Sequence, residues 1–312
     1  MIVKQEIREE CHFKSLYKTS KKGDCIVQVQ DFGGYQLEIH QTTGSRGGHR
    51  YFVVPLGSIP DSLHIPERIE VDRQVGKGKK PTILKSIEEA PLKSVTASLS
   101  PVEGSPAALI GWASKLAADS GNSRQHQAEN KKTIDIGNQL HEDIENFINN
   151  NVVAENPLFV AWYKAVGEPA YQEGGTWLGT EVFTYDPTTE RAGTLDAVYQ
   201  APSGEVTLYD WKTKNTKSYY DHKPFIKDHV QAFAYCWSLW NTMSLVRPDK
   251  MKVVYIMRDE DHKVEIAEVP LHPRLSATPQ EPAGMLKYIW RRSNEILKDM
   301  DTYLGGQEDG DE

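Results

Sequence analysis

The sequence predicts an α/β protein in which helices flank a mixed central β-sheet, preceded by a β-rich N-terminal region. Three observations predict this class. Residues 1 to about 90 contain alternating polar and apolar runs that are typical of strands. From about residue 94 the pattern changes to helical periodicity, and beyond residue 176 strands and helices follow each other in the order β-β-β-α-β-β-α. With 312 residues, the chain is long enough for one large domain or two small ones.

The N-terminal region predicts a small antiparallel sheet. Residues 25–30 and 35–40 alternate and flank Gly33-Gly34, which is a hairpin signal, and residues 51–55 can add a further strand. No catalytic constellation is visible in this region, so we expect either an accessory domain or an elaboration of the main one. The predicted domains are 1–90 (β-rich and accessory), 91–305 (main) and 306–312 (a disordered acidic tail).

The main domain is predicted element by element. Apolar residues at helical spacing indicate helices at 107–117, 125–150, 157–166, 224–243 and 283–304. Strands are expected near 176–186, 191–200 and 205–212, and a hairpin joins 253–256 to 264–267. We find no internal repeat.

The second and third strands of this domain bear charged residues at informative positions. Asp196 lies on one strand, and Asp210 and Lys212 lie on the next, after a short turn. Residues i and i+2 of a strand share a face, so Asp210 and Lys212 project together while Trp211 points away. If the strands are neighbours, two carboxylates and one ammonium converge. Carboxylates bind hard cations such as Mg²⁺, and the lysine can orient or deprotonate an attacking water, which is the chemistry of a metal-dependent nuclease.

An acid-x-Lys triplet is a common pattern, and an ordinary solvated ion pair is its alternative interpretation. The chain has four such triplets, at 129–131, 210–212, 221–223 and 261–263. The first lies in a polar helical run, the third in a predicted loop and the fourth in a predicted hairpin turn. Only Asp210 ends an alternating strand that follows a Gly-x-x-Asp strand, which favours the nuclease interpretation.

Two further residues are candidates for the same site. His141 flanks the apolar stripe of the helix at 125–150, where it is either a packed histidine or a metal ligand. Glu181 on the first strand is either an outward-facing acid or a catalytic carboxylate near the metal or beside Lys212.

Three residues are candidates for contact with DNA. Gln231 and Tyr235 lie one turn apart on the helix at 224–243. In one interpretation, Gln231 is solvated and Tyr235 is packed in the core. In the other, the amide of Gln231 binds a phosphate or sugar, and the ring of Tyr235 supports a base or orders the site. Lys214 shares the face of Lys212, where it either contacts a phosphate or ends the strand as a solvated charge.

Composition restricts the partner and the compartment. The net charge of −8 excludes a global basic field, although five lysines lie between residues 211 and 231. Three scattered cysteines indicate a reducing compartment without a disulfide framework. Neither a membrane span nor a signal or transit peptide is visible, so we expect a cytoplasmic protein of a bacterium or a phage-infected host and no membrane partner.

Taken together, five short motifs resemble the RecB-type branch of the PD-(D/E)xK nuclease superfamily. They occur in order as Gly137-x-x-x-His141-x-x-x-Glu145, Glu181, Gly193-x-x-Asp196, Asp210-x-Lys212 and Gln231-x-x-x-Tyr235. Residues 94–99 are also similar to the lead-in of single-chain members, among them the mitochondrial genome maintenance exonuclease. The resemblance covers roughly residues 90–270 and implies a PD-(D/E)xK (restriction-endonuclease-like) core.

The resemblance also implies a mechanism and a substrate. It implies that Mg²⁺ or Mn²⁺ is held by His141, Asp196, Asp210 and the carbonyl of Trp211, with Lys212 as the catalytic lysine. It implies cleavage of DNA, often from a free single-stranded end. Some relatives bind an iron–sulfur cluster through four cysteines, and because this chain has three, we expect no cluster.

The sequence therefore predicts a metal-dependent DNA exonuclease. Two alternatives stay open: a non-catalytic DNA-end-binding module on the same fold, and a structure-specific flap endonuclease. The sequence does not identify protein partners.

Overall fold

The computed structural model shows a mixed α/β fold with a central mixed sheet packed against helices. The structure describes residues 14–20, 23–31, 36–43, 49–59, 70–75, 82–87, 92–102, 114–115, 118–119, 121, 124–222, 225–242, 247–259, 261–269, 271, 286–287 and 289–295. The predicted helix at 107–117 lies outside these residues except for 114 and 115, which are helical, and the acidic tail lies wholly outside them.

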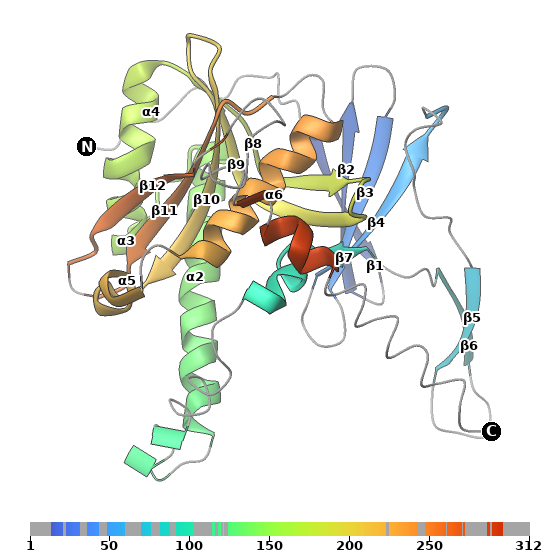
Figure 1. Cartoon of the computed structure of the whole chain (residues 1–312), viewed down its shortest axis with the longest axis horizontal. Coiled ribbons are helices and arrows are strands. Elements are labelled where there is room, and N and C mark those ends of the chain that lie inside the picture. The colour runs from blue at the N-terminus through green and yellow to red at the C-terminus, as the bar shows by residue number, and fades with distance from the viewer. Residues whose placement is uncertain are drawn as a thin grey trace.

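The N-terminal region forms the antiparallel sheet that its alternating pattern predicts. Its strands are β1 (Lys14–Ser20), β2 (Gly23–Asp31), β3 (Gln36–Thr43) and β4 (His49–Leu56), paired in the order β1-β2-β3-β4. A separate antiparallel ribbon consists of β5 (Glu70–Val75) and β6 (Thr82–Ile87). Figure 1 shows the four-stranded sheet in blue beside the central sheet.

The central sheet has six strands in the described part of the chain. They are β7 (Lys93–Ser94), β8 (Thr176–Asp186), β9 (Arg191–Gln200), β10 (Val206–Lys214), β11 (Lys250–Met257) and β12 (Val264–Val269). The order is β12-β11-β10-β9-β7, and β8 also pairs with β9. The β10–β11 and β7–β9 pairs are parallel and the others antiparallel, as expected of a mixed sheet.

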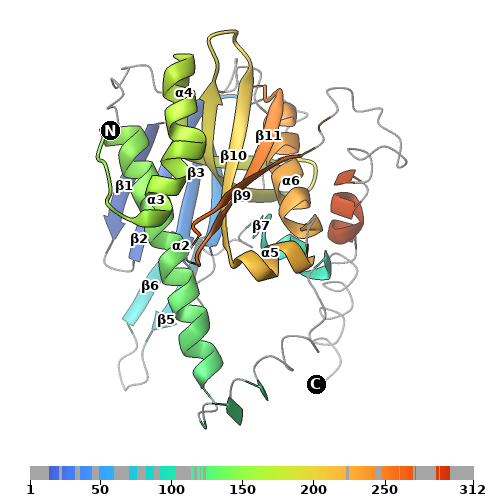
Figure 2. The same ribbon diagram turned by 90° about the vertical axis from the view of Figure 1, so that its left-hand side faces the viewer.

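Helices cover both faces of the central sheet. On one face lie α2 (Gln125–Asn150), α3 (Pro157–Trp162), the π-helical turn η2 (Tyr163–Gly167) and α4 (Glu168–Glu173). On the other lies α6 (Ile226–Thr242), and α5 (Thr216–His222) precedes it. Asp221 was expected to lie in a loop and lies in the helix α5 instead. Figure 2 shows α2, α3 and α4 on the opposite side of the sheet from α6.

Local sequence explains where these elements begin and end. Leu140, Ile144 and Phe147 give α2 its buried stripe, and the helix ends at Asn150 because the next residue, Asn151, adopts the left-handed conformation. The side chain of Asn156 accepts a hydrogen bond from the N–H of Leu158, with Pro157 at the first helical position, so α3 begins there.

Two apolar cores lie on the two faces of the sheet. One is rich in aromatic residues and is shared by α2, α3 and β8–β11; in it Trp211 packs edge-to-face on Trp162, with ring centroids 5.6 Å apart. The other joins α6 to the central sheet and to β3 and β4, through residues that include Leu37, Ile39 and Tyr51. The N-terminal sheet therefore packs directly on the central sheet. No helix in the described ranges is both long and apolar enough to cross a membrane.

Candidate active site

The pairing between β9 and β10 ends where the two aspartates begin. The last paired residues are Ala197 on β9 and Tyr209 on β10. The residue next to this pair, where the pairing stops, is Asp196 on β9 and Asp210 on β10. The N–H of Trp211 has no β9 partner in this ladder and donates instead to Asp196 Oδ2, at 2.5 Å. The strands are thus neighbours, as predicted, and their separation opens space between the two carboxylates.

This space is a cavity of about 360 Å³ that is lined mostly by polar side chains. The lining comes from both sheets, α2, α6 and the segment after β7: Gln41, Tyr51, Thr96, Asn138, His141, Glu142, Glu145, Glu181, Thr194, Asp196, Asp210, Lys212, Gln231 and Tyr235. Most residues that the sequence singles out therefore meet in one place. Lys214 is absent from the lining.

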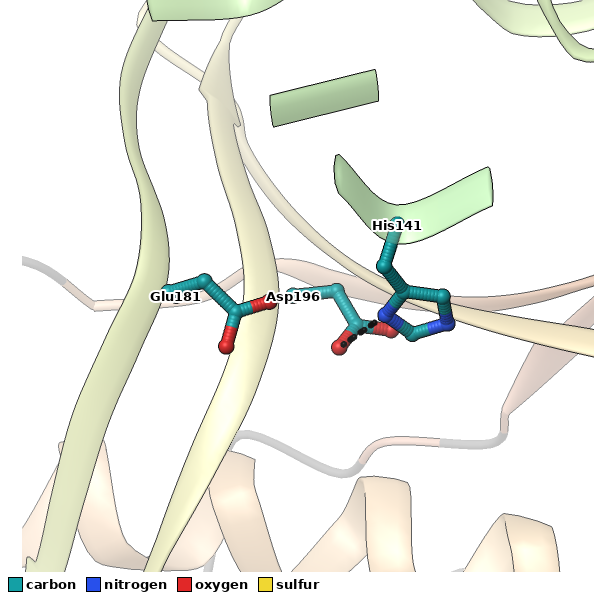
Figure 3. A group of neighbouring side chains, drawn as sticks. All are labelled: His141, Glu181 and Asp196. Carbon is teal, nitrogen blue, oxygen red and sulfur yellow. Dashed lines mark ion pairs between the residues drawn. The ribbon is translucent and has the colours of Figure 1, made fainter. Parts of the chain in front are cut away.

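Three side chains of the cavity form a group that can hold a metal ion. Ligand atoms of His141, Glu181 and Asp196 all lie within 4.8 Å of one another. Figure 3 shows the three side chains converging from the helix α2 and the strands β8 and β9. An imidazole nitrogen and carboxylate oxygens suit Mg²⁺, Mn²⁺ or Zn²⁺, so the donor set fits a divalent cation without identifying it.

The clustered set differs in one member from the ligand set that the resemblance implies. Glu181 is part of the group, whereas Asp210 is not. The carboxylate of Asp210, whose side chain is 2 % exposed, instead forms an ion pair with Lys212 at 2.5 Å. Asp210 and Lys212 therefore share a face, as expected, and Asp210 holds the ammonium at the cavity. The metal contacts predicted for Asp210 and for the carbonyl of Trp211 stay predictions.

Electrostatic interactions within the cavity shift the acid–base equilibria of the group. Burial alone would lower the pKa of His141, but attraction to Asp196, 3.4 Å away, outweighs burial and raises this pKa to about 9. Burial, followed by repulsion from Asp196, raises the pKa of Glu181 to about 8. Burial alone would raise the pKa of Asp196, but the cationic His141 and Lys212 lower it.

The ion pair beside the group keeps its charge. Burial alone would lower the pKa of Lys212, yet the carboxylates of Asp210 and Asp196 raise it above its ordinary value. Burial raises the pKa of Asp210 to about 6, although Lys212 opposes the shift. Lys212 is therefore an ammonium that can donate hydrogen bonds into the cavity.

Glycine at position 193 permits the close approach of α6 to this site. A Cβ atom on Gly193 would lie 2.6 Å from Cε1 of Tyr235 and 3.2 Å from Cγ2 of Val95. By contrast, a Cβ atom on Gly137 would meet only Oγ1 of Thr213, at an ordinary 3.6 Å. Of these two glycines in the sequence motifs, one is therefore required by packing and the other is not.

The candidate DNA-binding residues have other contacts in the structure. Gln231 donates to the hydroxyl of Tyr235 at 2.7 Å, and both line the cavity. Tyr235 is 2 % exposed, which fits a role in ordering the site better than stacking against a base. Lys214 forms an ion pair with Asp228 at 3.1 Å and lies over the ring of Phe225. Contact of these residues with DNA stays a prediction.

Sequence reasoning missed the contribution of the N-terminal sheet. Gln41 on β3 donates to Oγ1 of Thr194 at 2.8 Å and to the hydroxyl of Tyr51 on β4 at 3.2 Å. Tyr51 and Thr194 are themselves hydrogen-bonded at 2.9 Å. This neutral polar wall belongs to the cavity, although no catalytic constellation was expected in the region. The alternation of β3 and β4 offered no signal, because it does not say what the strands pack against.

Comparisons with known proteins give only distant likenesses. No family model and no curated protein matches the sequence. Among solved structures, SSO0001 is 16 % identical with a TM-score of 0.26. The match covers 52 % of this chain and 84 % of the SSO0001 chain. LHK-Exo in complex with dAMP is 15 % identical with a TM-score of 0.25. The match covers 62 % of this chain and 93 % of the LHK-Exo chain. Likenesses this distant say nothing about the chemistry of the cavity.

Proposed function

We propose that this protein is a Mg²⁺- or Mn²⁺-dependent deoxyribonuclease. The observation that supports it best is the convergence, in one cavity, of the metal-binding group and the buried Asp210–Lys212 ion pair. A hard cation and a fixed ammonium are what the hydrolysis of a phosphodiester needs, since both stabilise negative charge on the phosphate. A structural ion pair alone does not require three further titratable ligands beside it.

The residues of the chain divide the work as follows. His141, Glu181 and Asp196 would hold the cation, which when bound polarises the phosphate and acidifies a water. Lys212 donates a hydrogen bond to the attacking water or to a phosphate oxygen, and Asp210 fixes its position. Because Lys212 is an ammonium, orienting the water suits it better than deprotonating it.

We further propose that the enzyme acts on single-stranded DNA from a free end. A cavity of about 360 Å³ lies near the lower end of the range for small-molecule sites, and such a volume suits one nucleotide unit better than a duplex. The N-terminal sheet forms one wall of it through Gln41 and Tyr51. A strand end can enter such a walled site more readily than an uninterrupted duplex.

Cleavage assays on end-labelled DNA test this function. Linear single-stranded DNA should be degraded with Mg²⁺ or Mn²⁺ and should stay intact with EDTA. Asp210→Asn should lose cleavage, because Lys212 then loses its carboxylate partner. The matched control is Lys263→Met, at a surface acid-x-Lys triplet where the side chain is 52 % exposed, and it should keep full activity. Full activity in Asp210→Asn would refute the assignment of the active site to this cavity.

The same assay separates the alternatives. Covalently closed single-stranded DNA of the same sequence should resist cleavage, and equal cleavage of the circle would indicate an endonuclease. Flapped duplex cut at the junction would indicate a structure-specific endonuclease. DNA binding without cleavage under any metal condition would favour the end-binding module. A matched RNA strand tests whether the sugar matters.

A further inference from the structure

Glu181 has a backbone conformation that is unusual for its place in the fold. Four residues other than glycine have a positive φ among those that the structure describes. Three of them lie at the end of a helix or in turns: Asn151, Glu190 and His262. Glu181, with a φ of 48°, lies inside the strand β8. A left-handed residue within a strand is strained, and it persists only where its surroundings hold it.

Gln28 on β2, in the N-terminal sheet, forms two hydrogen bonds to this stretch of β8. Its side-chain oxygen accepts a hydrogen bond from the N–H of Phe183 at 2.7 Å, and its side-chain nitrogen donates to the carbonyl of Glu181 at 3.3 Å. Gln28 is 0 % exposed, so water cannot substitute for either bond. One buried amide thus bonds the backbone on both sides of Val182, directly after the strained residue Glu181.

We propose that Gln28 is a positioning residue for the metal ligand Glu181. Successive side chains of a regular strand point to opposite faces, so the direction of the Glu181 carboxylate depends on its departure from extended geometry. The two bonds from Gln28 fix the backbone that sets this direction. Without them, the backbone can leave its left-handed conformation at Glu181, and the carboxylate is then no longer fixed beside His141 and Asp196. The N-terminal sheet is then a working part of the metal site. This inference rests on the metal site of the proposed function.

The affinity for Mn²⁺ alone tests the proposal without relying on nuclease activity. Mn²⁺ is titrated into the full-length protein, and free Mn²⁺ is followed by its electron paramagnetic resonance signal. Gln28→Met keeps the size of the side chain and removes both bonds, so it should bind Mn²⁺ about tenfold more weakly or worse. The matched control is Gln200→Met, since Gln200 also bonds a backbone carbonyl, that of Gly204, but does not line the cavity. The control should bind as the wild type does.

A double-mutant cycle separates positioning from general damage to the fold. If Gln28 acts through Glu181, then Gln28→Met should weaken binding no further once Glu181→Gln is present. Equal additional loss in that background would overturn the proposal, because it would show an effect that does not pass through the carboxylate. Circular dichroism shows whether each variant is folded.

A second variant at Gln28 tests the same two hydrogen bonds. If Gln28→Met does not fold, Gln28→Glu replaces it, because that side chain still accepts from Phe183 but cannot donate to Glu181 as a carboxylate; it too should lose about tenfold in affinity. Wild-type affinity in the folded Gln28 variants would refute the positioning role alone. A wild-type protein that binds no Mn²⁺ would refute the metal site, and with it the proposed function.

Discussion

Two sheets meet at the cavity, and they contribute different kinds of residue. The central sheet supplies charged groups, Glu181, Asp196, Asp210 and Lys212, that can bind a cation or act on a phosphate. The N-terminal sheet supplies neutral groups that bond to the backbone or side chains of β8 and β9: Gln28, Gln41 and Tyr51. Neutral amides and hydroxyls fix positions in a buried site without adding charge to it. In the proposed mechanism, reactive and positioning roles are thus divided between the two sheets.

The largest expected contrast between the sheets is in the rate of cleavage. Asp196→Asn removes a ligand charge from the central sheet and should lower the rate about a thousandfold, since a metal supplies several kcal/mol of transition-state stabilisation. Tyr51→Phe removes two neutral hydrogen bonds, with Thr194 and with Gln41, of about 0.5–1.5 kcal/mol each, and should lower the rate only about tenfold. Single-turnover rates measure both. Equal losses of rate in the two variants would contradict this division of roles.

The second prediction concerns the stability of the charged residues in the central sheet. Lys212→Met leaves the buried Asp210 without its partner and should lower the free energy of unfolding by about 3 kcal/mol at pH 8. The folded-state pKa of Asp210, already raised to about 6, then rises further above its unfolded value. The loss is therefore full above that pKa and shrinks as the pH falls through it.

Urea unfolding of the single and double variants checks this stability prediction. Asp210→Asn with Lys212→Met should recover most of the loss, because no uncompensated charge is left. An unstable double variant would show that packing of the lysine, rather than its charge, stabilises the cavity.

The third prediction concerns pH. With pKa values of about 9 for His141 and about 8 for Glu181, both are protonated in the metal-free protein below pH 8 and must lose a proton to bind a cation. The affinity for Mn²⁺ should therefore rise with pH, by up to about a hundredfold per unit below pH 8. In Glu181→Gln the rise should fall to about tenfold per unit. Calorimetric titration in two buffers counts the released protons, and a pH-independent affinity would contradict the metal assignment.

The smallest expected effects distinguish two glycines of the sequence motifs. Gly193→Ala forces a Cβ against Tyr235 and should cost about 1–3 kcal/mol of stability. Gly137→Ala lies in α2, meets no close atom, and should stabilise the protein by up to about 1 kcal/mol. Thermal unfolding measures both changes, and a reversed order would show that the two positions are packed differently.

Periodicity and residue type predicted much of the architecture. The strands β8, β9 and β10, the helices α2 and α6, and the β11–β12 hairpin all lie within a few residues of their expected ranges. The sequence predicted that β9 and β10 are neighbours, because strand alternation and a short turn are local properties. This pairing places Asp196, Asp210 and Lys212 in one cavity.

What the sequence did not predict depends on tertiary packing. Gln28, Gln41 and Tyr51 lie in alternating strands that read the same whichever sheet they face, and only the packing of the two sheets gives them partners at the cavity. Lys214 shares the face of Lys212 by strand geometry, yet Asp228 on α6 forms an ion pair with it. The left-handed conformation of Glu181 likewise has no local sequence signal.

Crystals grown with Mn²⁺ and measured at the manganese absorption edge test the central claim most directly. That claim is that His141, Glu181 and Asp196 hold a divalent cation beside the Asp210–Lys212 ion pair. The account predicts one strong anomalous peak among these three side chains, and its loss in Asp196→Asn crystals. A peak elsewhere, or none in the cavity under saturating Mn²⁺, would contradict it.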